Sequence, residues 1–117
     1  MNAIDIDRLE TGYLHAKAAL KAVTWPGGYP AYPKAVSAFM LSLCQPPWGR
    51  QDYDPRLTTG LLERLEQASA TELCHVLTAL GRAERFSDGI WISYLEDDRF
   101  DRIIARARAL LGSPKPD

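Results

Sequence analysis

Apolar residues recur every three or four positions through most of this chain, a spacing that predicts amphipathic helices. The first periodic segment runs from about Ile4 to about Val23 and ends at the stretch TWPGGYPAYP. A second segment follows Pro33, a residue type that suits the first position of a helix, and stops at Pro46 and Pro47. Both segments are predicted to be helices that bury one face.

Three more helices are expected in the second half of the chain. Asp54 is placed to cap the first of them, whose leucine stripe contains Gly60. Ser69 and Glu72 have the spacing of a capping box, in which each side chain accepts a bond from the other residue's backbone. The last periodic segment ends at Gly112. These signals predict a single helical domain over residues 1–112 and a short mobile tail over 113–117.

The segment IWISYL, residues 90 to 95, fits two structures. Its β-branched and aromatic residues favour a strand, whereas Ser87 or Asp88 could cap a short helix. A strand would pair with AERF across the turn SDG, which gives an α+β fold with a small C-terminal hairpin, like a winged helix. We favour the helix because a lone hairpin is marginally stable. The predicted fold is therefore an all-α bundle of five or six helices.

Composition narrows the function classes. The 117 residues are 46% hydrophobic and 25% charged, which suits one self-folding domain. Fourteen basic and fifteen acidic residues give a net charge of -1, so no positive field attracts nucleic acid or an anionic membrane. The polar start lacks a leader, and no apolar run approaches the roughly 20 residues of a membrane helix. We expect a cytoplasmic protein with no membrane partner, and the charge balance disfavours nucleic acid as a partner without excluding it.

Metal and cofactor chemistry finds little support in the sequence. The soft-ligand residues are His15, Cys44, Cys74 and His75, with no paired-cysteine motif among them. Cys74 and His75 are neighbours on a predicted helix and point about 100° apart. The stretch PGGYP lacks the lysine that follows a phosphate-binding loop. No metal and no cofactor is predicted.

The densest group of charged and aromatic residues is GRAERFSDGIW, residues 81 to 91. If the fourth helix continues to Arg85, then Arg82 and Arg85 share one side and form a fork for carboxylate or phosphate. The alternative is an internal ion-pair network with Glu84, Asp88 or the acids of LEDD. Equal numbers of arginines and acids over residues 82 to 108 favour the network.

The same stretch also has the features of a joint between helices. Asp88 is placed to cap a helix or turn, and Gly89 permits a backbone shape that other residues resist. Phe86 and Trp91 are then expected to anchor the bend in the core on either side. The joint and the site are thus predicted to use different side chains of one motif.

Two loops rich in proline and aromatic residues connect the early helices, WPGGYPAYP and QPPWGRQDYDP. Prolines stiffen such loops and large rings dominate their burial energy, so we favour a structural role in covering helix ends. The alternative is an aromatic groove for a peptide or small ligand. Its partly exposed members would be Trp25, Tyr29, Tyr32, Trp48 and Tyr53.

At LTALGRAERFSDGIW, followed by LEDD and FDRIIARARALL, the chain resembles a family of small bacterial proteins grouped as a domain of unknown function. The matching positions are Leu77, Thr78, Arg82, Glu84, Arg85, Phe86, Asp88 and Gly89. Tyr32 and Trp48 also fit its pattern, whereas Asp98 stands where the family often has glycine. The resemblance implies a bacterial, cytoplasmic protein and assigns no catalytic residue.

The sequence therefore predicts a small binding or assembly module whose partner is a protein or a small anionic ligand, with a homodimer left open. One alternative is an enzyme with Glu84 or Asp88 as acid/base and Arg82 and Arg85 as anion clamp. A second alternative is a winged-helix nucleic-acid binder. The candidate binding residues are Tyr32, Trp48, Arg82, Glu84, Arg85, Asp88 and Trp91.

Overall fold

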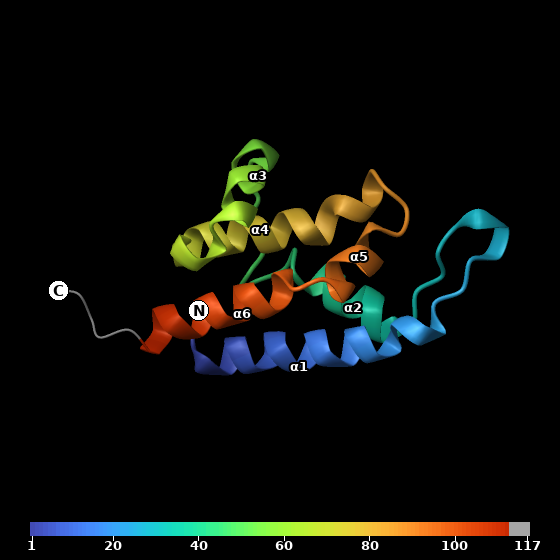
Figure 1. The fold of residues 1–117 in the computed structure, drawn as a ribbon, viewed down its shortest axis with the longest axis horizontal. Helices are drawn as coiled ribbons and strands as arrows, with labels where there is room; N and C mark the ends of the chain where they lie inside the picture. The colour runs from blue at the N-terminus through green and yellow to red at the C-terminus, as the bar shows by residue number, and fades with distance from the viewer. Residues whose placement is uncertain (113–117) are drawn as a thin grey trace.

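The computed structural model describes residues 1–112, except for the side chains of Pro55, Leu57 and Thr59, and its described part is helical (Figure 1). Its α-helices are α1 (Ala3–Ala19), α2 (Lys34–Ser42), α3 (Pro55–Glu63), α4 (Ala70–Arg82), α5 (Ile90–Glu96) and α6 (Arg99–Gly112). The all-α prediction is confirmed. The winged-helix alternative is wrong, because residues 83 to 85 form a 3-10 turn and residues 90 to 96 a helix. The predicted tail lies outside the described residues.

Side-chain caps fix where several helices begin. The predicted capping box is present, since the Ser69 hydroxyl accepts a bond from the Glu72 N–H at 3.1 Å and Glu72 accepts one from the Ser69 N–H at 2.9 Å. Asp54 caps α3 as expected. A further box, between Asn2 and Asp5, begins α1. No described helix is long and apolar enough to cross a membrane.

The core forms where α1, α2, α4 and α6 meet (Figure 1). Phe100 of α6 is fully buried between two aromatic rings, with centroids 5.2 Å from Tyr13 and 5.4 Å from Phe39. Figure 1 shows α6 running back along α1, so that both helices bury one face against the others. This burial is the main source of stability, because the apolar side chains leave water together.

The end of α4 approaches α2 closely at a glycine. A Cβ added to Gly81 would lie 2.7 Å from the Cys44 sulfur and 2.8 Å from the Met40 carbonyl oxygen. Any larger residue would push the two helices apart, because real Cβ atoms do not come so close to backbone. Gly81 therefore sets the spacing between the ends of α2 and α4, where the candidate site lies.

Residues 23 to 33 project from the bundle (Figure 1). Thr24 and Ala31 pair through two backbone bonds, at 3.3 and 2.7 Å between nitrogen and oxygen, and form an isolated bridge rather than a strand. Trp25 and Tyr29 on this loop are exposed, but the Trp25 ring also lies against Gly89 at the start of α5, so the expected structural role is wrong only for Tyr29 of these two rings. It is confirmed for Trp48, which is buried.

Candidate functional site

Glu84 joins the end of α4 to the start of α5. Its Oε2 accepts a hydrogen bond from the Gly89 N–H at 2.6 Å, and its Oε1 accepts one from the Trp91 N–H at 3.2 Å. Gly89 itself has φ of 87°, a conformation that favours glycine, and no side chain of its own to cap the helix. The prediction that Asp88 caps this helix is wrong: Asp88 is exposed, and the carboxylate of Glu84, four residues earlier, takes the role.

Trp91 anchors the bend, as predicted. Its side chain is 6% exposed, and the indole N–H donates to the Leu80 carbonyl oxygen at 3.1 Å. Its ring lies 5.2 Å from that of Tyr32, tilted by 45°. Burial, and then the nearby Glu84 carboxylate, raise the pKa of the Tyr32 hydroxyl, so Tyr32 stays protonated.

Phe86 is not the second anchor of the bend, and that prediction is wrong. Its side chain is 83% exposed. α4 ends at Arg82 and continues as a 3-10 turn over Ala83–Arg85. Phe86 follows six positions after Leu80, about 240° around a helix, so it lies off the apolar stripe of α4.

The expected ion-pair network is also wrong for Arg82 and Arg85. Neither forms an ion pair or hydrogen bond with a described residue; Arg82 lies over the Tyr53 ring at 4.8 Å, and Arg85 is exposed. The four later arginines are instead held by carboxylates or by a carbonyl: Arg99, Arg102, Arg106 and Arg108. Because Glu84 caps α5 and Asp97 pairs with Arg99, these acids do not neutralise the two arginines of the bend.

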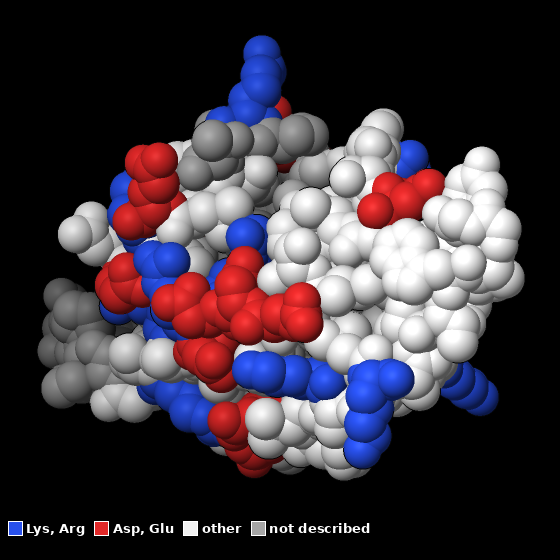
Figure 2. All heavy atoms as spheres, turned by 45° about the vertical axis from the view of Figure 1, so that its right-hand side comes forward, with Lys and Arg blue, Asp and Glu red and all other residues white. Residues whose placement is uncertain are grey.

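A hollow of about 610 Å³ lies between the ends of α2 and α4. Its lining includes Leu41, Cys44, Gln45, Arg82, Arg85 and Trp91. Figure 2 brings the right-hand end of Figure 1 forward, and this end carries few charged side chains. Two guanidinium groups beside apolar surface can hold a carboxylate or phosphate of a ligand that also has an apolar part.

The structure divides the predicted site residues into three groups. Arg82, Glu84, Arg85 and Trp91 all line the hollow. The Tyr32 ring packs against the Trp91 ring, and Asp88 is exposed and does not line the hollow. Trp48 lines a separate hollow, which α1 helps to form. No group of three acidic, histidine or cysteine side chains in the described part of the chain could hold a metal.

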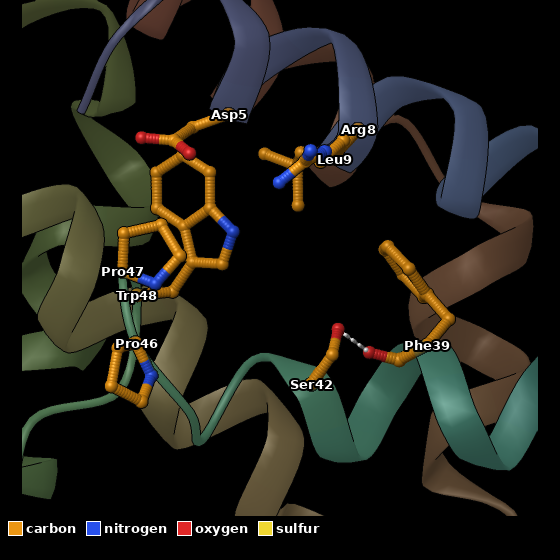
Figure 3. A pocket seen from close by; sticks show the side chains of 8 residues that line it. All are labelled: Asp5, Arg8, Leu9, Phe39, Ser42, Pro46, Pro47 and Trp48. Atoms are coloured by element: carbon orange, nitrogen blue, oxygen red, sulfur yellow. Dashed lines mark hydrogen bonds between the residues drawn. The ribbon is translucent and has the colours of Figure 1, made fainter.

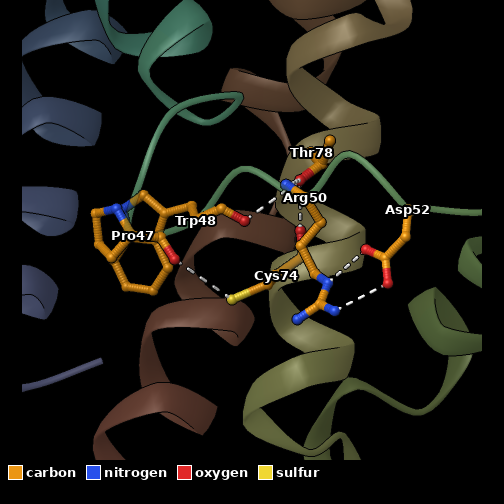
Figure 4. Close-up of polar contacts among 6 residues, drawn as sticks. All are labelled: Pro47, Trp48, Arg50, Asp52, Cys74 and Thr78. Carbon is orange, nitrogen blue, oxygen red and sulfur yellow. Dashed lines mark hydrogen bonds and ion pairs between the residues drawn. The ribbon is translucent and has the colours of Figure 1, made fainter.

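Thr78 holds the loop that carries Trp48, a role that sequence reasoning missed (Figure 4). Thr78 is fully buried, and its hydroxyl donates to the Cys74 carbonyl oxygen at 2.8 Å. The hydroxyl oxygen also lies 3.3 Å from the Trp48 carbonyl oxygen, a second acceptor within reach. The same oxygen accepts the Arg50 N–H at 3.0 Å. The available signal was a hydroxyl on the apolar stripe of a helix, a position that requires partners.

Thr78→Val is expected to destabilise the protein by about 1–3 kcal/mol, because the Arg50 N–H loses its acceptor within the fold. Valine keeps the shape of threonine, so packing changes little. Urea denaturation followed by circular dichroism measures the effect. Thr71→Val, at an exposed position of the same helix, is the control, and an equal loss in both variants would contradict the assigned role.

Residues 27–113 match the model of a family of unknown function, DUF6508. The chain belongs to this family. The DUF6508 match spans α2 to α6, and so includes the bend, the hollow and Thr78. No curated protein and no solved structure matches the chain. The resemblance to a domain of unknown function is thereby confirmed, and family membership assigns no activity.

Proposed function

We propose that this DUF6508 protein is a binding module that takes the carboxylate or phosphate of a partner protein or small ligand in the hollow at the bend. Arg82 and Arg85 bind the anionic group, and an apolar part of the same ligand lies on Leu41, an exposed side chain that lines the hollow. The observation that carries the proposal is that both guanidinium groups lie at a hollow without a carboxylate partner among the described residues.

The local geometry favours binding by reducing the entropy lost when the arginines are ordered. Stacking on Tyr53 at 4.8 Å holds the Arg82 guanidinium, so less side-chain freedom is lost when a ligand arrives. Arginine also offers two parallel N–H groups, which match the two oxygens of a carboxylate. Arg85 on the adjacent turn supplies the second positive charge.

The enzyme alternative receives less support from the same residues. Both Glu84 oxygens already accept backbone N–H bonds, from Gly89 and Trp91, which is the duty of a helix cap. Asp88 does not line the hollow. A bacterial cytoplasmic location is part of the proposal, and the free thiols of Cys44 and Cys74 support it.

Arg82→Ala and Arg85→Ala are each expected to weaken anion binding at the hollow about tenfold or more, the loss of one charge-assisted hydrogen bond of roughly 1.5–3 kcal/mol. NMR titration with pyrophosphate and with citrate measures the dissociation constant from the amide shifts of Gly81 and Arg85.

Arg56→Ala is the matched control, because it removes the same charge from a side chain that is 89% exposed on α3. An equal loss in Arg56→Ala would indicate unspecific attraction to positive charge. Absence of any saturable shift, with both anions and with an acidic peptide containing aromatic residues, would refute the proposal.

A further inference from the structure

A second hollow, of about 200 Å³, lies on the other side of α2 from the bend (Figure 3). Phe39 and Ser42 of α2 face it, whereas Leu41 and Cys44 face the hollow at the bend. The N-terminal part of α1 forms another wall, and the turn that carries Trp48 completes the lining. The two hollows are thus separate sites with different side chains.

Trp48 presents a hydrogen-bond donor to this second hollow. The residue is only 6% exposed, yet its indole N–H forms no hydrogen bond with a described residue. Trp91, which is equally buried, donates to a carbonyl of the protein. Figure 3 shows the Trp48 nitrogen directed toward the open centre of the hollow. The nitrogen itself is open to the hollow rather than buried, so it can donate to water or to an acceptor on a ligand.

Arg8 adds a positive charge to the wall formed by α1 (Figure 3). It forms no ion pair or hydrogen bond with a described residue, although three acids surround it in the sequence. Asp7 and Glu10 are held by Arg108, at 3.1 and 2.6 Å. The remaining acid, Asp5, accepts the Asn2 N–H at 3.2 Å in the capping box. Arg8 therefore has no carboxylate partner among the described residues.

We propose that this hollow binds the carboxylate of a small monocarboxylic acid, free or at the C-terminus of a peptide. The Trp48 indole N–H and the Arg8 guanidinium donate to the carboxylate, and the apolar body lies on Phe39 and the two prolines of the turn. The volume is below the roughly 300–1,000 Å³ typical of pockets for larger ligands. Asp5 also lines the hollow, and its negative charge opposes phosphates and dicarboxylates more strongly than it opposes a single carboxylate.

The test follows the Trp48 indole signal by ¹H–¹⁵N NMR, with N-acetyl-leucine as the probe and N-acetyl-leucinamide as the uncharged match. Trp48→Phe assigns the signal and removes the donor while keeping a ring. The acid is expected to shift the signal in a saturable way, and Arg8→Gln is expected to weaken binding at least tenfold. Arg56→Gln, which removes an equal charge on α3, is expected to bind as the unsubstituted protein does.

Equal binding of the acid and the amide would overturn the proposal, as would no saturable shift below about 10 mM, a very weak affinity. The proposal would also be overturned if Arg82→Ala abolished the shift of the Trp48 indole signal, since Arg82 lines the other hollow. A peptide with a free C-terminal leucine, compared with its amidated form, separates the two sources: binding of the free peptide alone assigns the carboxylate to a chain end. Arg8 is exposed, so Arg8→Gln decides the question even where Trp48→Phe does not fold.

Discussion

Replacing Trp91 by alanine is expected to lower the free energy of unfolding by about 3–5 kcal/mol. The ring is 6% exposed, lies 5.2 Å from the Tyr32 ring and donates to the Leu80 carbonyl at 3.1 Å. Alanine would leave a cavity at the bend and a carbonyl without its side-chain donor. Urea denaturation, followed by the far-ultraviolet circular dichroism of the helices, measures the change.

Two further variants separate the parts of the Trp91 contribution. Trp91→Phe keeps most of the apolar ring and removes only the bond to Leu80, so an intermediate loss of about 1–3 kcal/mol is expected. Phe86→Ala is the control, since an 83% exposed side chain contributes within about 0.5 kcal/mol. If Phe86→Ala cost as much as Trp91→Ala, the bend would be anchored differently from the structure.

The helices could be predicted from the sequence because their signals are local. The i, i+3, i+4, i+7 stripes indicated α2, α4 and α6, and the spacing of Ser69 and Glu72 marked the start of α4. Phe86 was misplaced because an apolar ring within a charged stretch suggests burial, whereas its position, about 240° from Leu80 around a helix, lies off the stripe of α4. The change to a 3-10 turn is decided by how α4 meets α2 and α5, which periodicity does not contain.

The candidate site was harder to predict from the sequence than the helices were, because it is formed by long-range contacts. Residue types alone identified Arg82, Arg85 and Trp91, but not that the carboxylate between the arginines would cap α5. Arg8 is the opposite case, because neighbouring acids in the sequence suggest a neutralised charge. The structure shows that Asp7 pairs instead with Arg108, which is 101 residues away along the chain. Which arginines remain unpaired is therefore a property of the fold rather than of local composition.

Glu84→Ala is expected to destabilise the protein by about 2–3 kcal/mol, more than a typical cap, because one carboxylate satisfies two backbone donors. The Gly89 and Trp91 N–H groups are partly buried at the start of α5 and would lose their acceptors. Amide hydrogen exchange at these two positions is expected to become faster, in addition to a lower midpoint in urea. Glu63→Ala, at an exposed position of α3, controls for loss of an acidic side chain.

Glu84→Gln distinguishes a cap from a ligand-binding or catalytic carboxylate. The amide oxygen can still accept one of the two N–H groups, whereas the NH₂ group opposes the other donor, so about half of the loss is expected to return. Stability that is unchanged in both Glu84 variants, together with altered ligand affinity, would contradict the capping role. A helix cap requires that Glu84→Ala lose the full stability contribution and Glu84→Gln only part of it. The reason is that the loss follows the number of acceptors that remain for the two N–H groups.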